Sequence, residues 1–145
     1  MKVLIQRVKQ SDVKINNETV AKINKGILAL VGIERGDTKE QVEKLAKKVV
    51  NLRIFPDDND KMNRSLADIQ GEMLIVSQFT LCGDCKKGTR PSFDKSAPPD
   101  IANDLYEYFV STVKGYGIIV GTGKFGEMME VSLINDGPVT FMLEG

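Results

Sequence analysis

Positions 26–33 form an unbroken run of eight apolar and glycine residues, Gly-Ile-Leu-Ala-Leu-Val-Gly-Ile. A strand that is apolar at every position must be covered on both faces, as in the interior of a parallel or mixed sheet. A membrane-spanning helix needs about 18 consecutive apolar residues, and no segment of the chain approaches that length. We therefore expect a layered domain that does not enter a membrane, with residues 26–33 as a buried strand.

Shorter segments on both sides of this run predict further strands. Apolar residues such as Val3 and Ile5 alternate with polar ones, as in strands that are exposed on one face. Asn16-Asn17 is a turn signal that would join two such strands as a hairpin. The expected strands span residues 2–9, 12–16, 19–23, 72–81, 117–121, 128–134 and 139–143.

Two segments have helical spacing. Asp37 followed by Glu40 matches a capping box and predicts a helix over residues 38–51. Ser96 predicts the cap of a second helix, whose first turn tolerates the prolines that follow. The residues expected on the buried stripes are Val42, Leu45, Ala46 and Val49 in the first helix and Ile101, Leu105, Phe109 and Val113 in the second. Residues 1–145 would then form one mixed α/β domain.

Composition limits the possible chemistry. The chain has no histidine, which excludes Ser-His-Asp and Cys-His catalysis and histidine-containing zinc sites. Its 20 basic and 20 acidic residues cancel, which argues against duplex binding and DNA as a partner, while a local patch can still hold one end of an RNA. The first apolar run ends after three residues, too short for a signal peptide, and only two cysteines are present. We therefore expect a cytoplasmic protein.

Two familiar motifs are interpreted as loops. Residues 121–126 match the dinucleotide fingerprint G-x-G-x-x-G, but a strand rather than a helix is expected to follow them. Cys82 and Cys85 form a C-x-x-C pair that lacks the further ligands of a zinc site and a following helix to lower a thiol pKa. We expect no metal and no cofactor, and we keep a thiol-redox protein that uses these cysteines as an alternative.

Two other segments carry stronger local chemistry. Residues 77–81, Ser-Gln-Phe-Thr-Leu, place polar side chains at the end of an otherwise apolar strand, as either a half-exposed strand end or a site. Gly137-Pro138 lies between two expected strands, where a cis peptide bond and an ordinary turn are both options. A basic cluster also follows the first segment, and it would hold a phosphate if that strand end is an active site. Its members are Lys86, Lys87 and Arg90.

Five strings spread over the whole chain carry a resemblance to a known family. They are Ile-Gln-Arg-Val at 5–8, Ser-Gln-Phe-Thr-Leu at 77–81, Gly-Thr-Arg-Pro-Ser-Phe at 88–93, Thr-Gly-Lys-Phe-Gly at 122–126 and Asn-Asp-Gly-Pro-Val-Thr at 135–140. The second and last are specific as a pair at this separation, although either alone is weak. On these residues the chain resembles the D-aminoacyl-tRNA deacylase family, also called D-tyrosyl-tRNA deacylase. The C-x-x-C departs from the family pattern, so its thiols are not expected in the shared mechanism.

The resemblance implies a single domain of curved, barrel-like sheets with two main helices, and a homodimer with two sites built across its interface. The implied substrate is aminoacyl-tRNA, whose ester to the terminal adenosine is hydrolysed. Gly137-Pro138, in cis and braced by Arg7, would project its carbonyl groups into the partner's pocket. By the same match, the pocket would be lined by Ser77, Gln78, Phe79 and Thr80, with Phe125 and Met129 flanking the substrate.

Such chemistry does not require histidine. Backbone N–H groups near Phe79 and Thr80 would stabilise the developing oxyanion, a contribution of about 3–4 kcal/mol for one good donor, while the adenosine 2′-hydroxyl assists the attacking water. No base adjoins Thr80 in the motif, so we expect it to position groups rather than act as the nucleophile. An L side chain would meet the Gly-Pro carbonyls, whereas a D side chain would point to solvent. Glycine has nothing to reject, so glycyl-tRNA, as mischarged on tRNA-Ala, is also an expected substrate.

One further alternative remains beside the thiol-redox protein. It is a module that binds the acceptor end of an RNA without catalysis.

Overall fold

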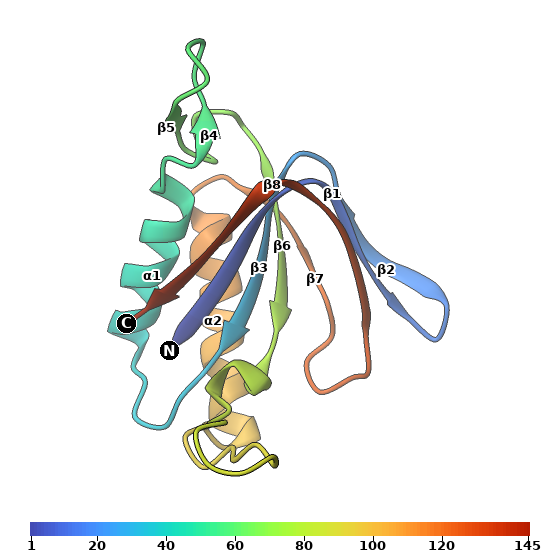
Figure 1. The fold of residues 1–145 in the computed structure, drawn as a ribbon, viewed down its shortest axis with the longest axis vertical. Helices are drawn as coiled ribbons and strands as arrows, with labels where there is room; N and C mark the ends of the chain where they lie inside the picture. Colours follow the sequence, from blue (N-terminus) through green and yellow to red (C-terminus); the bar gives the residue numbers. More distant parts are fainter.

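The central layer is one six-stranded mixed sheet, seen in the computed structural model of residues 1–145 (Figure 1). Its strands lie in the order β2-β1-β3-β6-β7, and β8 pairs with β1 as well. The pairs β3–β6 and β6–β7 are parallel, whereas β1 runs antiparallel to β2, β3 and β8. The strands are β1 (Lys2–Ile15), β2 (Glu18–Ile23), β3 (Gly26–Gly32), β6 (Glu72–Ser77), β7 (Ile119–Thr122) and β8 (Glu130–Glu144).

Two helices, α1 (Lys39–Asn51) and α2 (Pro99–Gly115), pack side by side against the sheet (Figure 1). A small hairpin of β4 (Phe55–Pro56) and β5 (Met62–Arg64) projects at one end, and a single 3-10 turn, η1 (Phe79–Cys82), follows β6. The sheet curls until β2 approaches β7, since a Cβ added to Gly121 in β7 would lie 3.3 Å from the Cβ of Ala21 in β2. The sheet is therefore nearly closed and barrel-like, and the expected fold class is confirmed.

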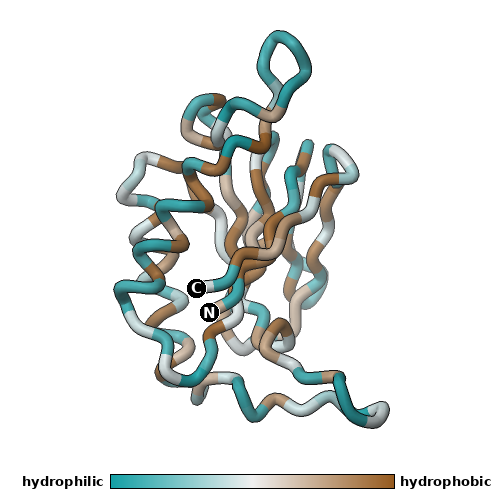
Figure 2. Tube along the Cα trace, turned by 60° about the vertical axis from the view of Figure 1, so that its left-hand side comes forward, coloured by the Kyte–Doolittle hydropathy of each residue, from teal (hydrophilic) through white to brown (hydrophobic).

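The apolar run at 26–33 is covered on both faces, as predicted. Ile27, Ala29 and Val31 belong to the large core between the sheet and the helices. Leu28 belongs to a smaller apolar cluster inside the curve of the sheet. Figure 2 shows hydrophobic residues along the strands and hydrophilic ones at the outer loops. No residue of β3 is exposed.

Two local predictions hold. The β1–β2 hairpin turns at Asn16 and Asn17, whose φ angles of 50° and 66° lie in the left-handed region that such a turn requires. Residues 123–129 form a turn between β7 and β8, and no helix follows them. The glycine-rich motif at 121–126 therefore lacks the helix N-terminus that binds a pyrophosphate.

β1 is one long strand where two short strands were expected. It runs through Lys9 and Gln10, where the apolar alternation breaks, because its pairing with β8 shifts register on either side of Val8. Ile5 before the break and Val13 after it are both fully buried. Such irregularities let one strand change the phase of its buried face, and they depend on the partner strand rather than on local sequence.

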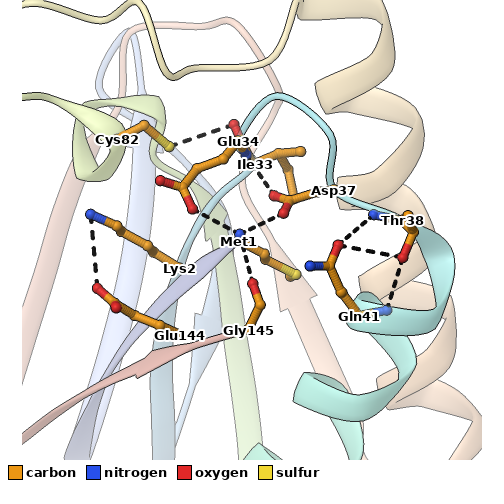
Figure 3. Close-up of polar contacts among 10 residues, drawn as sticks. All are labelled: Met1, Lys2, Ile33, Glu34, Asp37, Thr38, Gln41, Cys82, Glu144 and Gly145. Carbon is orange, nitrogen blue, oxygen red and sulfur yellow. Dashed lines mark hydrogen bonds and ion pairs between the residues drawn. The ribbon is translucent and has the colours of Figure 1, made fainter.

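The cap of α1 lies one residue later than predicted. Thr38 is the N-cap: its hydroxyl accepts a hydrogen bond from Gln41 N at 3.4 Å, and the Gln41 side chain accepts one from Thr38 N at 2.7 Å. The Asp37 carboxylate instead accepts hydrogen bonds from the Met1 amino group at 2.7 Å and from Glu34 N at 2.6 Å (Figure 3). Because these donors occupy it, Asp37 does not cap the helix.

α2 also begins later than predicted. Its N-cap is Pro98, without a side-chain hydrogen bond, so the prediction of Ser96 as the cap is wrong. Ile101 is 49% exposed, and its placement in the core is wrong as well. The Tyr106 hydroxyl donates to Ile75 O in β6 at 2.9 Å, which fixes the rotation of α2 on the sheet. The buried residues are Ala102, Leu105, Tyr106, Phe109, Val110 and Val113. Neither helix has the length and apolar character that crossing a membrane requires.

Candidate functional site

The first candidate segment, residues 77–80, leaves the sheet earlier than predicted. β6 ends at Ser77, which pairs with Val31, and Gln78 N makes a last hydrogen bond to Val31 O at 2.8 Å. The chain then turns into η1, so the expected strand over 72–81 is four residues too long at its C-terminal end. This turn directs Phe79 and Thr80 outward, and the Phe79 side chain is 56% exposed.

The turn leaves two backbone N–H groups without acceptors. Within η1 and its flanks, Leu81 N donates to Gln78 O and Gly83 N donates to Thr80 O, but Phe79 N and Thr80 N donate to no group of the chain. The first N–H groups of any helical turn lack intrahelical partners. The side-chain amide of Gln78 donates a hydrogen bond to the Thr80 hydroxyl, which orients that hydroxyl. The segment thus offers hydrogen-bond donors at an exposed strand end.

Phe125 and Met129 lie at the same end of β6. The Phe125 ring packs against Tyr106, with centroids 6.0 Å apart, and the Tyr106 hydroxyl bonds Ile75 two residues before Ser77. Burial raises the pKa of Tyr106, so it remains a neutral hydrogen-bond donor. Gly123 N approaches Ile75 O at 3.3 Å, and a Cβ on Gly123 would lie 2.4 Å from the Met129 sulfur. The β7–β8 turn is therefore held beside the strand end.

Arg7 and Gly137-Pro138 form a second group. Arg7 Nε donates to Asp136 O at 2.8 Å and lies 3.4 Å from the Asp136 carboxylate, while its Nη1 donates to Ile54 O at 2.7 Å. The Gly137-Pro138 peptide bond is cis, and both residues are exposed. Arg7 therefore connects β1, the segment before β4 and the exposed Gly-Pro loop.

Asn135 holds the same loop and was not among the predicted site residues. Its Nδ2 donates to Arg7 O at 2.9 Å and to Val139 O at 3.0 Å, and its Oδ1 accepts from Val139 N at 3.1 Å. These bonds replace part of the backbone hydrogen bonding between β8 and β1 where β8 bends, so β8 continues through the loop. The two strands predicted at 128–134 and 139–143 are therefore one strand. The residue type could have indicated this role, because Asn side chains readily form hydrogen bonds with nearby backbone in turns.

The two groups lie at opposite ends of the sheet within one protomer. Arg7 pairs with Ile27, which pairs with Met73, and Met73 precedes Ser77 by four residues. Four residues of strand span about 13 Å, and the segment after Ser77 extends farther in the same direction. Figure 1 shows the bend of β8 at the top of the sheet and η1 at the bottom. The structure therefore brings Ser77–Thr80, Phe125 and Met129 together, and it does not bring Arg7 or Gly137-Pro138 to them.

The C-x-x-C pair has no reactive geometry. Cys82 is buried at the end of η1, its thiol faces Ile33 O at 3.5 Å (Figure 3), and it forms no disulfide with the exposed Cys85. Burial raises the pKa of the Cys82 thiol, and the nearby Glu34 carboxylate adds to this effect. A redox thiol needs a lowered pKa, so the thiol-redox alternative finds no support. No group of three or more carboxylate and thiol side chains is arranged so that it could hold a metal ion.

Comparison with known proteins finds one family along almost the whole chain. A family model described as D-Tyr-tRNA(Tyr) deacylase matches residues 4–144. A D-aminoacyl-tRNA deacylase of Thermosipho africanus is 58% identical over 144 residues, which cover 99% of this chain and 97% of the relative. One from Desulfatibacillum aliphaticivorans is also 58% identical over 144 residues, 99% of each chain.

Two solved structures have the same fold as this chain. A c-Myc DNA unwinding element binding protein superposes with a TM-score of 0.95 at 39% identity, covering 100% of this chain and 99% of that one. A probable eukaryotic D-amino acid tRNA deacylase superposes with a TM-score of 0.84 at 21% identity, covering 98% and 97%. At 21% identity the likeness concerns the fold alone.

Proposed function

The chain belongs to the D-Tyr-tRNA(Tyr) deacylase family and is a hydrolase of the ester bond in D-aminoacyl-tRNA, and from this premise we propose that its active sites are completed across a homodimer. The observation that carries the proposal is the separation of the two residue groups. Ser77–Thr80 and Gly137-Pro138 lie at opposite ends of one protomer, so a pocket that contains both needs a second copy. Enzymatic hydrolysis also removes the non-catalytic RNA-binding module as an alternative.

Exposed apolar side chains at the strand end and along β8 support the dimer. An exposed cluster of large apolar residues on a small protein commonly marks an interface. Phe79 is 56% exposed beside the strand end, and Met142 is 47% exposed in the part of β8 that follows Gly137-Pro138. In a twofold dimer each contact occurs twice, so a Gly-Pro loop at the partner's strand end would complete both pockets. Other exposed apolar residues that could be buried in this way are Phe93, Met128, Ile134 and Phe141.

In the proposed reaction, water adds to the ester carbonyl carbon, and the bond from that carbon to the ribose oxygen then breaks. The free N–H groups of Phe79 and Thr80 would stabilise the negative charge on the carbonyl oxygen. The neighbouring 2′-hydroxyl of the adenosine would guide the water, and the ribose oxygen leaves with a proton. The Thr80 hydroxyl, oriented by Gln78, would position the substrate. Phe125 and Met129 would flank it.

Selectivity would come from the Gly-Pro loop of the partner. Arg7 and Asn135 hold that loop rigidly through hydrogen bonds of 2.7–3.1 Å. A rigid pair of carbonyl groups facing the α-carbon of the substrate would exclude an L side chain and admit a D side chain or none. Hydrolysis of glycyl-tRNA follows from the same reasoning.

Substrate comparison tests this selectivity. D-Tyr-tRNA, L-Tyr-tRNA and glycyl-tRNA are incubated with the protein, and loss of the ester is followed over time. The proposal expects hydrolysis of the D-tyrosyl and glycyl esters, with the L-tyrosyl ester decaying at its rate in buffer. Inert glycyl-tRNA under conditions that clear D-Tyr-tRNA would contradict exclusion by a clash.

DNA binding, which the name of the 39%-identical structure states for that protein, is not part of our proposal. The formal net charge of zero offers no excess of cations to neutralise a duplex. A local contact to one RNA end is consistent with this balance.

A further inference from the structure

We propose that the loop formed by residues 85–90, here called the basic loop, binds the phosphate groups of the single-stranded acceptor end just before the terminal adenosine. The inference rests on the proposed function, because it assigns a second contact to the same substrate. The loop contains Lys86, Lys87 and Arg90, and all three are exposed. None of them forms an ion pair within the chain.

The base of the basic loop is fixed to the candidate pocket. Asp84 N donates to Ser92 O at 2.8 Å, and Ser92 N donates to Asp84 O at 3.0 Å, which closes the loop. Phe93 then packs edge-on against Phe79, with ring centroids 5.1 Å apart. Figure 1 shows the loop beside η1 at the bottom of the molecule. Because Phe79 lines the proposed pocket, an RNA strand whose last adenosine enters that pocket has its preceding phosphates near the loop.

The acidic side chains near the basic loop do not neutralise it. Asp84 accepts a hydrogen bond from the backbone N–H of Lys86 at 2.9 Å and lies 3.8 Å from the Lys95 amine. Asp94 accepts a hydrogen bond from the Ser92 hydroxyl at 2.8 Å. Both carboxylates therefore stabilise the base of the loop, while the three cations at its tip face solvent. A local positive surface on a chain of zero net charge directs a polyanion to that place.

A second group of unpaired cations provides a matched control. Lys44, Lys47 and Lys48 lie on the exposed face of α1, and they form no ion pair either. No contact links them to η1 as the pair Phe79 and Phe93 links the basic loop. Removing these lysines changes the net charge by the same amount but leaves the loop intact.

The test compares two substrates, D-Tyr-tRNA and D-tyrosyl-adenosine, which has the same ester and no phosphate. The loop variant is Lys86→Ala/Lys87→Ala/Arg90→Ala, and the control variant is Lys44→Ala/Lys47→Ala/Lys48→Ala. We expect the loop variant to lose about tenfold or more in kcat/KM on D-Tyr-tRNA at low salt, and to stay within about twofold on D-tyrosyl-adenosine. Each lost contact to a single-stranded phosphate lowers the salt slope by about 0.7, so the slope should fall by about 2. The control variant should match the unmodified protein on both substrates.

Three other results would overturn the inference. They are an unchanged kcat/KM and salt slope for the loop variant on D-Tyr-tRNA, an equal loss on both substrates, and an equal loss in the control variant. A charge-conserving variant, Lys86→Arg/Lys87→Arg/Arg90→Lys, should keep most of the activity on D-Tyr-tRNA. If the unmodified protein hydrolysed neither substrate, the proposed function itself would be refuted. Failure of the proposed function is therefore distinguishable from failure of the basic-loop inference.

Discussion

The hydroxyl of Thr80 makes one hydrogen bond, which it accepts from the side-chain amide of Gln78. An amide N–H can orient a hydroxyl but cannot take its proton, and no carboxylate or amine of the protomer bonds this oxygen. A nucleophilic threonine needs a neighbouring base. We therefore keep the proposal that the free N–H groups of Phe79 and Thr80, rather than a covalent acyl-Thr80 intermediate, carry the chemistry.

Replacing Thr80 tests this assignment. Thr80→Ala should lower kcat/KM on D-Tyr-tRNA by about tenfold or less, because one hydrogen bond is worth about 0.5–1.5 kcal/mol. Thr80→Ser, which keeps the hydroxyl, should lose less. Single-turnover hydrolysis measures both. A loss of several powers of ten with substrate still bound, or a trapped acyl-Thr80 adduct, would favour the covalent route.

The two cysteines should be dispensable for catalysis. Cys82→Ser/Cys85→Ser is expected to keep deacylation within about twofold, because neither thiol contacts the proposed reacting groups and burial raises the Cys82 pKa. Alkylation of the folded protein by iodoacetamide, read by mass spectrometry, should label Cys85 and spare Cys82. Rapid labelling of Cys82, or inactivation of the double variant, would reopen a thiol role.

At the scale of elements, the predictions that succeeded rest on local chemistry. The apolar run at 26–33, the Asn16-Asn17 hairpin and the α1 stripe all appear as expected because each depends on its own residues. The predictions that failed depend on distant partners. β1 stays continuous through pairing with β8, the α1 cap shifts because the Met1 amine takes the Asp37 carboxylate, and β6 ends early where η1 begins.

The shifted cap of α1 has a direct test. Thr38→Ala should lower the free energy of unfolding by about 1 kcal/mol, since it removes the side-chain acceptor at the N-cap. Glu40→Ala, which alters the position predicted from sequence, should change it by less than about 0.5 kcal/mol. Chemical denaturation of both variants gives the comparison. A larger effect at Glu40 than at Thr38 would contradict the cap in the structure.

The Gly-Pro loop is an element held by Arg7. Arg7→Ala leaves Asp136 O and Ile54 O without their donor and should cost about 1–3 kcal/mol of stability. If the loop is the filter that rejects L side chains, the variant should also hydrolyse L-Tyr-tRNA faster relative to D-Tyr-tRNA. Gln6→Ala, which removes one exposed hydrogen bond to Thr140 in the same strand, is the control. Lower stability with an unchanged preference for D-Tyr-tRNA would show that the loop does not reject L side chains.

Across the whole chain, the sequence indicated candidate segments but not how far apart they lie. The strings around Thr80 and Pro138 were identifiable from residue types and resemblance. Their separation follows from the registers of β1 with β3 and of β3 with β6, and long-range register is not written in any local pattern. The separation is also what makes a second protomer necessary in the proposed mechanism.

Subunit mixing tests whether each pocket is filtered by the Gly-Pro loop of the partner. Arg7→Ala subunits, which keep an intact pocket behind a loosened filter, are co-refolded with an excess of Thr80→Pro subunits, which keep an intact filter but lack the free N–H group of Thr80 and should be slower by about 100-fold or more. In the mixed dimer the working pocket then receives the intact loop of its partner. Hydrolysis of L-Tyr-tRNA per working pocket should fall to the level of the unmodified protein while hydrolysis of D-Tyr-tRNA persists. Hydrolysis of L-Tyr-tRNA that stays at the Arg7→Ala level in confirmed mixed dimers would show that each protomer filters its own pocket, and would contradict a pocket completed by the partner.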